Sequence, residues 1–317
     1  MIAFALGRLG YALAVMLGVA TVAFGLLHLA GDPLAGLVPP GAAPEDQAAL
    51  RARYGLDRSL PAQYATFLGR AARGDLGDSW SQREPALAAV LDRLPATLAL
   101  TGAAVGLALA VGVPLGIAAG LRPRGPAAAV AAVVALLGQA VPGFWLGTLL
   151  ILLFAVRLGW LPATGLDSWR SLVLPAATLA VYPAATVVRL LRASLTGTLR
   201  LDHIRTARGK GLPPSVVLRR HLLPVALTPT LAYVGLQVGF LLGGAVVVEA
   251  VFAYPGVGQL ALGAAVDRDL PLVQAFVVVV AALVVAANLA VDLTAAWLDP
   301  RLRDVAVRRD PAPTGRA

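Results

Sequence analysis

Cysteine is absent from this chain, and Lys210 is the single lysine among its 26 basic residues. Without thiols the chain can form no disulfide framework, no thiolate nucleophile and no cysteine-based metal site. Histidine is scarce too, since His28, His203 and His221 are scattered along the sequence. No HExxH pattern, GxSxG pattern or phosphate-binding glycine loop with its lysine occurs. We therefore predict no catalytic residue, no bound metal, no cofactor in this chain and no ATP hydrolysis by it.

Charge is also in short supply: charged residues make up 14% of the 317 residues, and hydrophobic residues make up 58%. A soluble domain of this size needs a charged surface. Here, runs of about 20 residues pass with almost no charge, which is the length that crosses a hydrocarbon core about 30 Å thick. We predict an integral membrane protein in contact with lipid. The net charge of +9 would suggest a nucleic-acid partner in a soluble protein. Its basic residues cluster in particular loops, however, which indicates membrane topology and no nucleic acid.

Six apolar blocks are each long enough to span a bilayer. They cover residues 9–30, 96–120, 128–156, 172–191, 225–251 and 272–298. A cleaved signal peptide is the alternative for the first block, but its apolar run is longer than a typical signal sequence and no clear small-residue cleavage site follows. The predicted fold class is therefore all-α, a polytopic membrane protein with six transmembrane helices.

Basic loops set the predicted orientation, because Lys and Arg resist translocation more than acidic residues do. The loop with Arg122 and Arg124, the loop at residues 192–220 and the C-terminal tail are all basic. Six spans with both termini in the cytoplasm place all three inside and residues 31–93 outside. Residues 46–54 and 62–72 of that external segment have apolar residues at helical spacing, which predicts a small helical subdomain.

The predicted organisation thus has three parts. Residues 1–95 contain the first transmembrane helix and the external subdomain at 31–93. Residues 96–303 contain a five-helix core with one short cytoplasmic helix at 202–211, and residues 304–317 form a cytoplasmic tail.

Few polar side chains lie inside the six blocks. They are Gln139, Gln237, Asn288 and Asp292, with Glu249 near an outer end. A proton- or sodium-coupled carrier usually needs ionisable groups near the middle of the membrane, where a charge costs about 3 kcal/mol on insertion scales. The lack of such a set argues against a carrier of that kind. The asparagine and the aspartate are predicted to make structural bonds between helices. The two glutamines and the glutamate are candidates for a translocation path, with helix bridging favoured for the glutamines.

The polar segment LDHIRTARGKGL at residues 201–212 lies between two apolar blocks. Asp202 is a good helix N-cap, and Gly211 followed by two prolines provides a stop. One helical face would carry Ile204, Ala207 and Leu212. The other positions carry Arg205, Arg208 and Lys210. These features predict a short helix outside the bilayer, but a helix that only touches lipid headgroups would have the same charge.

The same segment resembles the cytoplasmic coupling motif of bacterial ABC importer permeases in the dipeptide, oligopeptide and nickel family. Further stretches similar to this family are LQVGFLLGGAVVVEAVFAYPGVGQL at 236–260, RDLPLVQ at 268–274 and NLAVDLTAAWLDPRLR at 288–303. Earlier stretches resemble the permease type with the longer external segment: the opening GRLGYALAVMLGVATVAFGLLHLAGDP, YGLDRSLPAQY at 54–64, GDLGDS at 74–79 and LGWLPATG at 158–165. The resemblance covers nearly the whole chain.

The resemblance implies a type I ABC importer permease fold in the bacterial plasma (inner) membrane, with import of di- or oligopeptides driven by ATP. It also implies a second homologous permease, two ATP-binding subunits that hold ATP and Mg, and an external substrate-binding protein. Nickel, opines or another small solute are alternative substrates. A stand-alone channel or secondary carrier is the alternative from a different class.

The resemblance further implies that residues 202–211 form a coupling helix that docks into a cleft of the ATP-binding subunit. The residues that it assigns to this contact are Asp202, Arg205, Thr206, Ala207, Arg208, Lys210 and Gly211. Gly211 would end the helix. Gly209 departs from the family pattern, in which alanine is common, and a glycine inside a helix costs up to about 1 kcal/mol.

Overall fold

The structure is a computed structural model that describes residues 2–29, 43–53 and 56–298, with side chains for residues 6–25, 43–49, 51–52, 56–237 and 239–291. This part of the chain is built from helices, and its single β-bridge joins Asp78 and Pro85. In chain order the helices are α1 (Ile2–Leu29), α2 (Pro44–Arg53), α3 (Leu60–Ala71), α4 (Ala86–Leu121), α5 (Pro126–Ala140), α6 (Gly143–Leu150), the π-helix η2 (Ile151–Arg157), the 3-10 helix η3 (Trp169–Leu172), α7 (Val173–Thr198), α8 (Asp202–Gly209), α9 (Pro214–Val216), the π-helix η4 (Val217–Leu222), α10 (Leu223–Val251), α11 (Val257–Val266) and α12 (Leu270–Leu298).

The apolar helices agree with the six predicted spans. Within the described residues, four helices are long and apolar enough to cross a membrane, and the number is six if each of two bent pairs counts as one span. The first pair, Pro126–Ala140 and Gly143–Arg157, meets at 107°. Val141 takes an extended conformation at this break, because a proline disfavours helical backbone in the residue before it, and Pro142 lacks an N–H to continue the helix.

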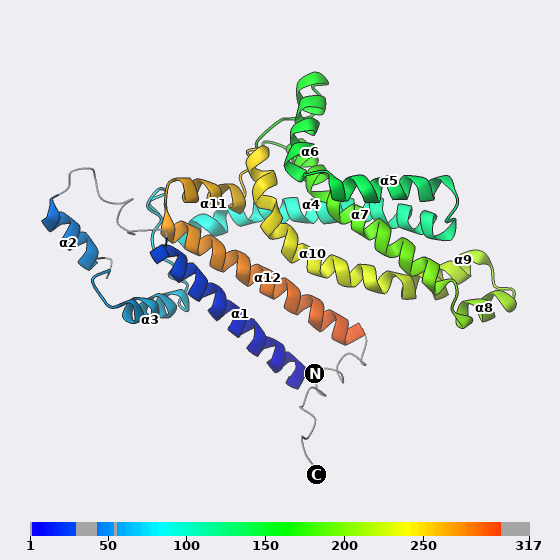
Figure 1. Cartoon of the computed structure of the whole chain (residues 1–317), viewed down its shortest axis with the longest axis horizontal. Coiled ribbons are helices and arrows are strands. Elements are labelled where there is room, and N and C mark those ends of the chain that lie inside the picture. Colours follow the sequence, from blue (N-terminus) through cyan, green and yellow to red (C-terminus); the bar gives the residue numbers. More distant parts are fainter. Residues whose placement is uncertain (1, 30–42, 54–55, 299–317) are drawn as a thin grey trace, which may run out of the picture. The chain divides into compact units, whose positions relative to one another are not determined.

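The chain divides into two compact units, residues 1–90 with 264–317 and residues 91–263. In the first unit α1 and α12 lie side by side (Figure 1), and the Gln274 side chain donates a hydrogen bond of 3.2 Å to the Ala23 carbonyl. The last helix therefore groups with the first helix in the structure, whereas the predicted boundary at residue 95 placed it with the core. Residues 304–317, the predicted tail, lie outside the described part.

Within the predicted external segment at 31–93 the structure has α2 and α3, close to the helical stretches expected at 46–54 and 62–72. The end of the segment differs from the prediction, because α4 begins at Ala86, before the predicted span at 96–120. Helix α3 packs on α1 through aromatic rings, because the Phe24 ring lies 5.2 Å from that of Tyr64 and 5.8 Å from that of Phe67. The hydroxyls of Thr21 and Tyr64 lie 2.6 Å apart. Residues 31–42 and 54–55 of this segment lie outside the described residues.

Helix α7 is the central element of the second unit, where α5, α6 and α10 pack against it (Figure 1). Glycines let α4 approach closely: a methyl group added at Gly112 would lie 2.8 Å from a methyl of Val187. Gly116 and Gly120 repeat this contact, one turn apart, against Leu191 and Leu195. Small residues every fourth position are the usual way in which membrane helices pack without a hydrophobic driving force.

Candidate functional sites

The short helix α8 is fixed to the second unit by its apolar face. Ile204 is fully buried and Ala207 is 5% exposed. Both belong to a core cluster with residues from α7, η4 and α10, which are Leu191, Leu195, Val217, Leu222 and Ala226. Because the anchoring residues are one turn apart, the whole helix is held in one orientation on the unit.

The ends of α8 differ in detail from the predicted ends. The helix begins one residue early, so Asp202 is its first residue and Leu201 takes the cap position without a side-chain hydrogen bond. Asp202 is therefore not the N-cap, although its charge still lies at the positive end of the helix. The predicted stop is confirmed, since Gly211 has a φ of +74°, which favours glycine. Leu212 follows this reversal and is exposed, contrary to the prediction of a shared buried face.

Gly209 turns out to be the last residue of α8, so it does not interrupt the helix interior as the sequence suggested. Its cost to helix stability is therefore smaller than for a central glycine.

The outer face of α8 is polar and basic. Arg205, Thr206, Arg208 and Lys210 are all exposed. Arg205 lies 3.7 Å from the Asp202 carboxylate, and both side chains are largely in solvent, so the pair adds little stability. No carboxylate within the described ranges forms an ion pair with Arg208 or Lys210. A rigid helix with free cationic groups is suited to contact an acidic or polar protein surface.

Among the candidate residues of the translocation path, Gln139 bridges two helices, which is the role that the sequence favoured for it. Its Oε1 atom accepts a hydrogen bond of 3.1 Å from Arg189, which joins α5 to α7. Arg189 was missed by the sequence analysis, although the signal is plain: it is a cation two residues inside the predicted block at 172–191. Gln237 is 7% exposed, and its Nε2 atom has no partner among the described residues.

The carboxylate of Glu249 is hydrogen-bonded to other parts of the fold in this structure. The side chain is fully buried, and its Oε1 atom accepts a hydrogen bond of 2.6 Å from the Thr97 hydroxyl. Its Oε2 atom accepts bonds from the N–H groups of Gly258 (2.7 Å) and Gln259 (3.0 Å) in the first turn of α11. The carboxylate thus caps α11, where the helix dipole favours negative charge. A role for Glu249 in a translocation path stays a prediction.

The predicted structural residues of the last span are only partly described. The Asn288 Oδ1 atom is buried without a hydrogen-bond partner in the described part of the chain, so the expected bond between helices is not observed for that atom. The side chain of Asp292 lies outside the described residues. No group of three or more metal-ligating side chains is present in the residues that the structure covers.

A buried carboxylate that the sequence analysis missed joins two of its motifs. The Asp269 Oδ2 atom, in RDLPLVQ, accepts hydrogen bonds from the hydroxyls of Ser79 (2.6 Å) and Ser81 (2.7 Å), near GDLGDS. The Ser81 N–H adds a third bond to this oxygen, and Oδ1 caps α12 through the Leu272 N–H at 3.2 Å. Burial raises the pKa of Asp269, but these hydrogen bonds outweigh it and hold the pKa below its usual value.

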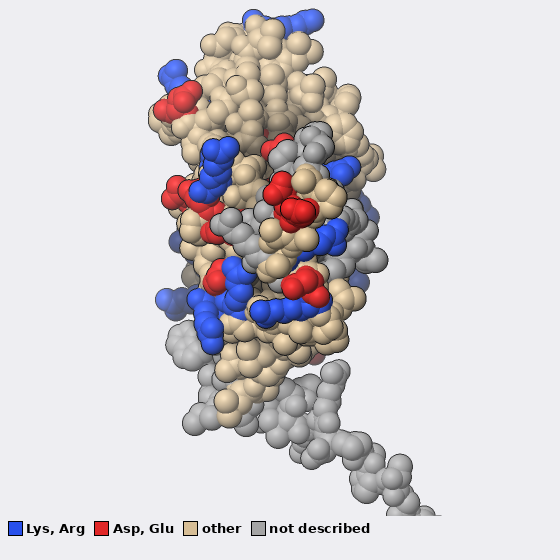
Figure 2. Space-filling view, turned by 90° about the vertical axis from the view of Figure 1, so that its left-hand side faces the viewer, with Lys and Arg blue, Asp and Glu red and all other residues tan. Residues whose placement is uncertain are grey.

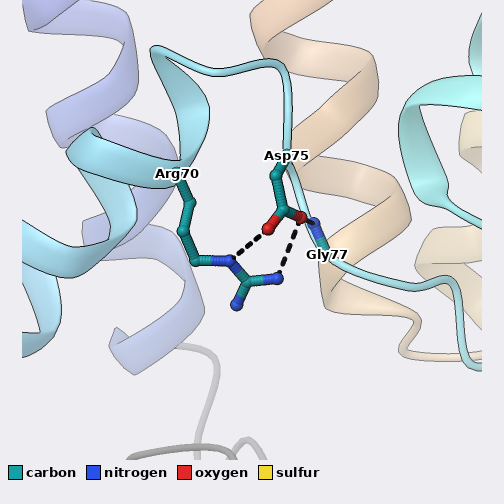
Figure 3. Close-up of polar contacts among 3 residues, drawn as sticks. All are labelled: Arg70, Asp75 and Gly77. Atoms are coloured by element: carbon teal, nitrogen blue, oxygen red, sulfur yellow. Dashed lines mark hydrogen bonds and ion pairs between the residues drawn. The ribbon is translucent and has the colours of Figure 1, made fainter.

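The turn after α3 is closed by an ion pair (Figure 3). Arg70 donates from Nε and Nη2 to the two carboxylate oxygens of Asp75, at 2.8 and 2.9 Å, and the Gly77 N–H donates to the same carboxylate at 3.1 Å. The hydrogen bonds from Arg70 and Gly77 lower the pKa of Asp75. Figure 2, seen from the side on which α2 and α3 lie in Figure 1, shows Lys and Arg interspersed with Asp and Glu. The described residues on this face therefore carry mixed charge.

Sequence comparisons match nearly the whole chain. Residues 112–304 match the family described as binding-protein-dependent transport system inner membrane component, and residues 1–101 match its N-terminal part. The chain is 35% identical to the dipeptide transport system permease protein DppB of Alkalihalophilus pseudofirmus, over 96% of this chain and 100% of the relative. It is 36% identical to the di/tripeptide transport system permease protein DppB of Pseudomonas aeruginosa and 37% identical to the glutathione transport system permease protein GsiC of Salmonella choleraesuis, each over 96% of this chain and 99% of the relative.

Solved structures show the same fold at lower identity. An inward-facing MetNI methionine ABC transporter matches with a TM-score of 0.52 and 23% identity, covering 68% of this chain and 95% of that one. An amino acid ABC transporter matches with a TM-score of 0.51 and 18% identity, covering 67% of this chain and 94% of that one.

Proposed function

This chain belongs to the inner membrane components of binding-protein-dependent transport systems, and from that premise we propose that it is the permease through which an ABC importer moves di- or oligopeptides across the bacterial plasma membrane. The peptide substrate is supported by the relatives, whose names specify dipeptides, di- and tripeptides or glutathione. The similarity to them covers all six apolar elements. Nickel, opines or another small solute remain the alternative cargo.

In this proposal α8 is the coupling helix, and the observation that carries it is the division of α8 into two faces. Ile204 and Ala207 anchor the helix in the core, while the basic face is free. An ATPase can drive a permease only if their contact has different binding free energies in the two conformational states. A helix that is rigidly attached to α7 and α10 transmits such a difference to the spans, whereas a loosely tethered helix would absorb it.

The complete importer in this proposal contains a second, homologous permease chain, two ATP-binding subunits and an external substrate-binding protein. ATP and Mg are bound by the ATP-binding subunits, and this chain is not an enzyme. Both termini lie in the cytoplasm. The segment at residues 31–93 is external, and its mixed-charge surface contacts the substrate-binding protein or caps the pore.

The test is uptake by the purified complex in proteoliposomes, with the substrate-binding protein added outside. We expect uptake of a radiolabelled dipeptide to require both ATP and that protein, because the sequence has no relay of Asp, Glu or His side chains deep in several apolar blocks on which a proton or sodium gradient could act. Nickel supplied with the same subunits is the comparison. Uptake of nickel without uptake of peptide would replace the proposed substrate, and uptake driven by an ion gradient without ATP would overturn the importer class.

A companion experiment tests the partners. A tagged chain extracted in mild detergent should retain an ATP-binding subunit, and combined substitution of Arg205, Arg208 and Gly211 should release it. Substitution of Arg122 and Arg124, which lie in another basic loop, is the matched control. Equal retention in both variants would show that α8 is not the docking element.

A further inference from the structure

One exposed face of α7 differs from the rest of that helix. Of the 18-residue window that qualifies α7 as a span, 72% is buried, a larger share than in the other three single-helix spans. Beyond Val173 at its start, the exposed residues of α7 are Tyr182, Arg189, Ala193 and Gly197. Their spacing of seven, four and four places them on one side of a helix. This side carries a phenol, a guanidinium group and two small residues, so it offers hydrogen-bonding groups to a polar molecule.

Arg189 is a cation inside an apolar span. It lies nine residues before Thr198, the end of α7, which is about 13 Å at 1.5 Å per residue. Gln139 accepts a hydrogen bond from one of the five N–H groups of Arg189. No carboxylate in the described part of the chain lies within ion-pair distance of Arg189. Since an arginine in a span is costly, its presence calls for an anionic partner that the described residues do not supply.

The facing side of α10 is polar as well. Thr230, Tyr233 and Gln237 follow one another at helical spacing, and each has a buried polar atom without a hydrogen-bond partner within the described residues. Thr230 is 1% exposed and Gln237 is 7% exposed. A buried unpaired polar group usually costs about 1–3 kcal/mol, so three in succession indicate a place that receives polar partners.

The two polar sides meet. Helices α7 and α10 pack together, and the Tyr233 hydroxyl lies close to the Thr186 side chain and within electrostatic reach of Arg189. The helical stretch Pro214–Gln237, which includes α9, η4 and the first part of α10, is bent by 53° against Gly239–Val251, so the bend lies beside Gln237.

We propose that Tyr182, Thr186, Arg189, Tyr233 and Gln237, the α7–α10 polar strip, line the solute path, and that the Arg189 guanidinium binds the terminal carboxylate of the peptide in transit. This inference rests on the proposed peptide substrate. A guanidinium fork matches a carboxylate with two parallel hydrogen bonds. The terminal carboxylate is shared by peptides of any sequence, so this contact suits a path that must pass many different side chains.

The first experiment tests accessibility, and the natural absence of cysteine makes it direct. Single cysteines are introduced as Ala193→Cys, on the exposed face of α7, and as Leu236→Cys, on an exposed apolar position of α10. The complete complex in lipid vesicles permeabilised to small solutes is treated with a water-soluble, membrane-impermeant thiol reagent. We expect the first position to react about tenfold faster than the second, because a thiolate forms in water and not in lipid. Equal rates, or a faster reaction at position 236, would overturn the strip.

The second experiment tests Arg189 by protection of that cysteine. A saturating dipeptide with a free carboxylate should slow labelling of the Ala193→Cys protein about tenfold, the effect of one charge-assisted contact, and its C-terminal amide should not. Arg189→Gln should abolish protection, measured as the ratio of the labelling rates of that variant with and without dipeptide, and Arg189→Lys should retain part of it. Arg192→Gln, one turn away, is the matched control. In that variant the dipeptide should slow labelling as much as it does with Arg192 in place. Protection by the amide, protection in Arg189→Gln or no protection by the free dipeptide would each refute the assignment.

Labelling requires neither ATP nor delivery by a binding protein, so the two proposals fail separately. A complex that imports peptides but shows no protection would refute the carboxylate contact alone. A complex with an accessible strip that imports no peptide would refute the proposed substrate.

Discussion

At the scale of single residues, the conformation of Gly211 separates two effects of mutation. A Cβ atom added at this position would meet no atom of the described residues within 4 Å, so the fold has room for a side chain to start there. The left-handed backbone is what disfavours other residues, at a cost of about 1–2 kcal/mol. A bulky substitution is therefore a probe of the partner surface more than of the fold.

We expect Gly211→Leu to insert and fold normally but to uncouple ATP hydrolysis from uptake, because the added side chain enters the contact with the ATP-binding subunit. The measurement is the ratio of peptide transported to ATP hydrolysed in proteoliposomes. Gly211→Asn is the control, since asparagine tolerates this conformation and is small. An unchanged ratio in Gly211→Leu would show that the helix end does not touch the ATPase.

The carboxylate of Asp269 has a predictable pH dependence. Its pKa in the folded chain is below the ordinary value of 3.8, so its stabilisation is fully present above that value and is lost as the pH falls through the lowered pKa. Thermal unfolding of the wild type should therefore lose stability below about pH 4, and Asp269→Asn should cost about 2 kcal/mol at pH 7 and less in acid. If the difference between the two proteins were the same at pH 7 and pH 3, the charge would not be the cause.

At the scale of elements, hydrophobic runs and helical spacing were enough to predict the spans, α2, α3 and α8. Helix α11 was not predicted and fell within an expected loop, because ten apolar residues carry no clear local start signal. Its start is supplied by Glu249 and Thr97 from other helices. The pairing of Asp269 with Ser79, which are 190 residues apart, is likewise invisible to local patterns. Sequence reasoning found elements defined by their own residues and missed the contacts that depend on the folded chain.

The cap of α11 predicts a clear mutational effect. Glu249→Gln replaces one of the two acceptor oxygens with an NH2 group, which donates hydrogen bonds. That NH2 group would face either the Thr97 hydroxyl or the two N–H groups of α11, all of which donate to Glu249 in the wild type. We expect a loss of about 2–3 kcal/mol of stability, measured by thermal unfolding in detergent. Thr97→Val should cost less, because the two backbone bonds remain. A Glu249→Gln protein as stable as the wild type would mean that the carboxylate is not needed as a cap.

Packing of α4 on α7 makes a second prediction at this scale. Gly112→Leu adds four carbon atoms where a single methyl group already lies 2.8 Å from Val187, so it should lower stability by about 1–3 kcal/mol or more. Gly106→Leu, on the same helix but with no atom within 4 Å of the added carbon, is the matched control and should be tolerated. Similar stability of the two variants would contradict the close approach of the helices.

At the scale of the whole molecule, orientation in the membrane is the property to measure. We expect Arg124→Cys to react with an impermeant thiol reagent only from the cytoplasmic side, and Ala72→Cys only from the outside, because basic loops are retained inside. Labelling of intact cells and of inverted vesicles distinguishes the two sides. The reverse pattern would invert the proposed topology and would place α8 away from ATP.

The hydrogen bonds between Asp269 and the two serines can form only late in synthesis of the chain. The Ser79 turn is made early in translation and its acceptor is made late, just before the last helix. Until residue 269 is made, these hydroxyls lack the Asp269 carboxylate, and α12 follows only afterwards. The contact can therefore form only when the last spanning helix is about to be made. A chain that ends before residue 269 would lack both this contact and α12, so the Ser79 turn would keep hydroxyls without their carboxylate partner.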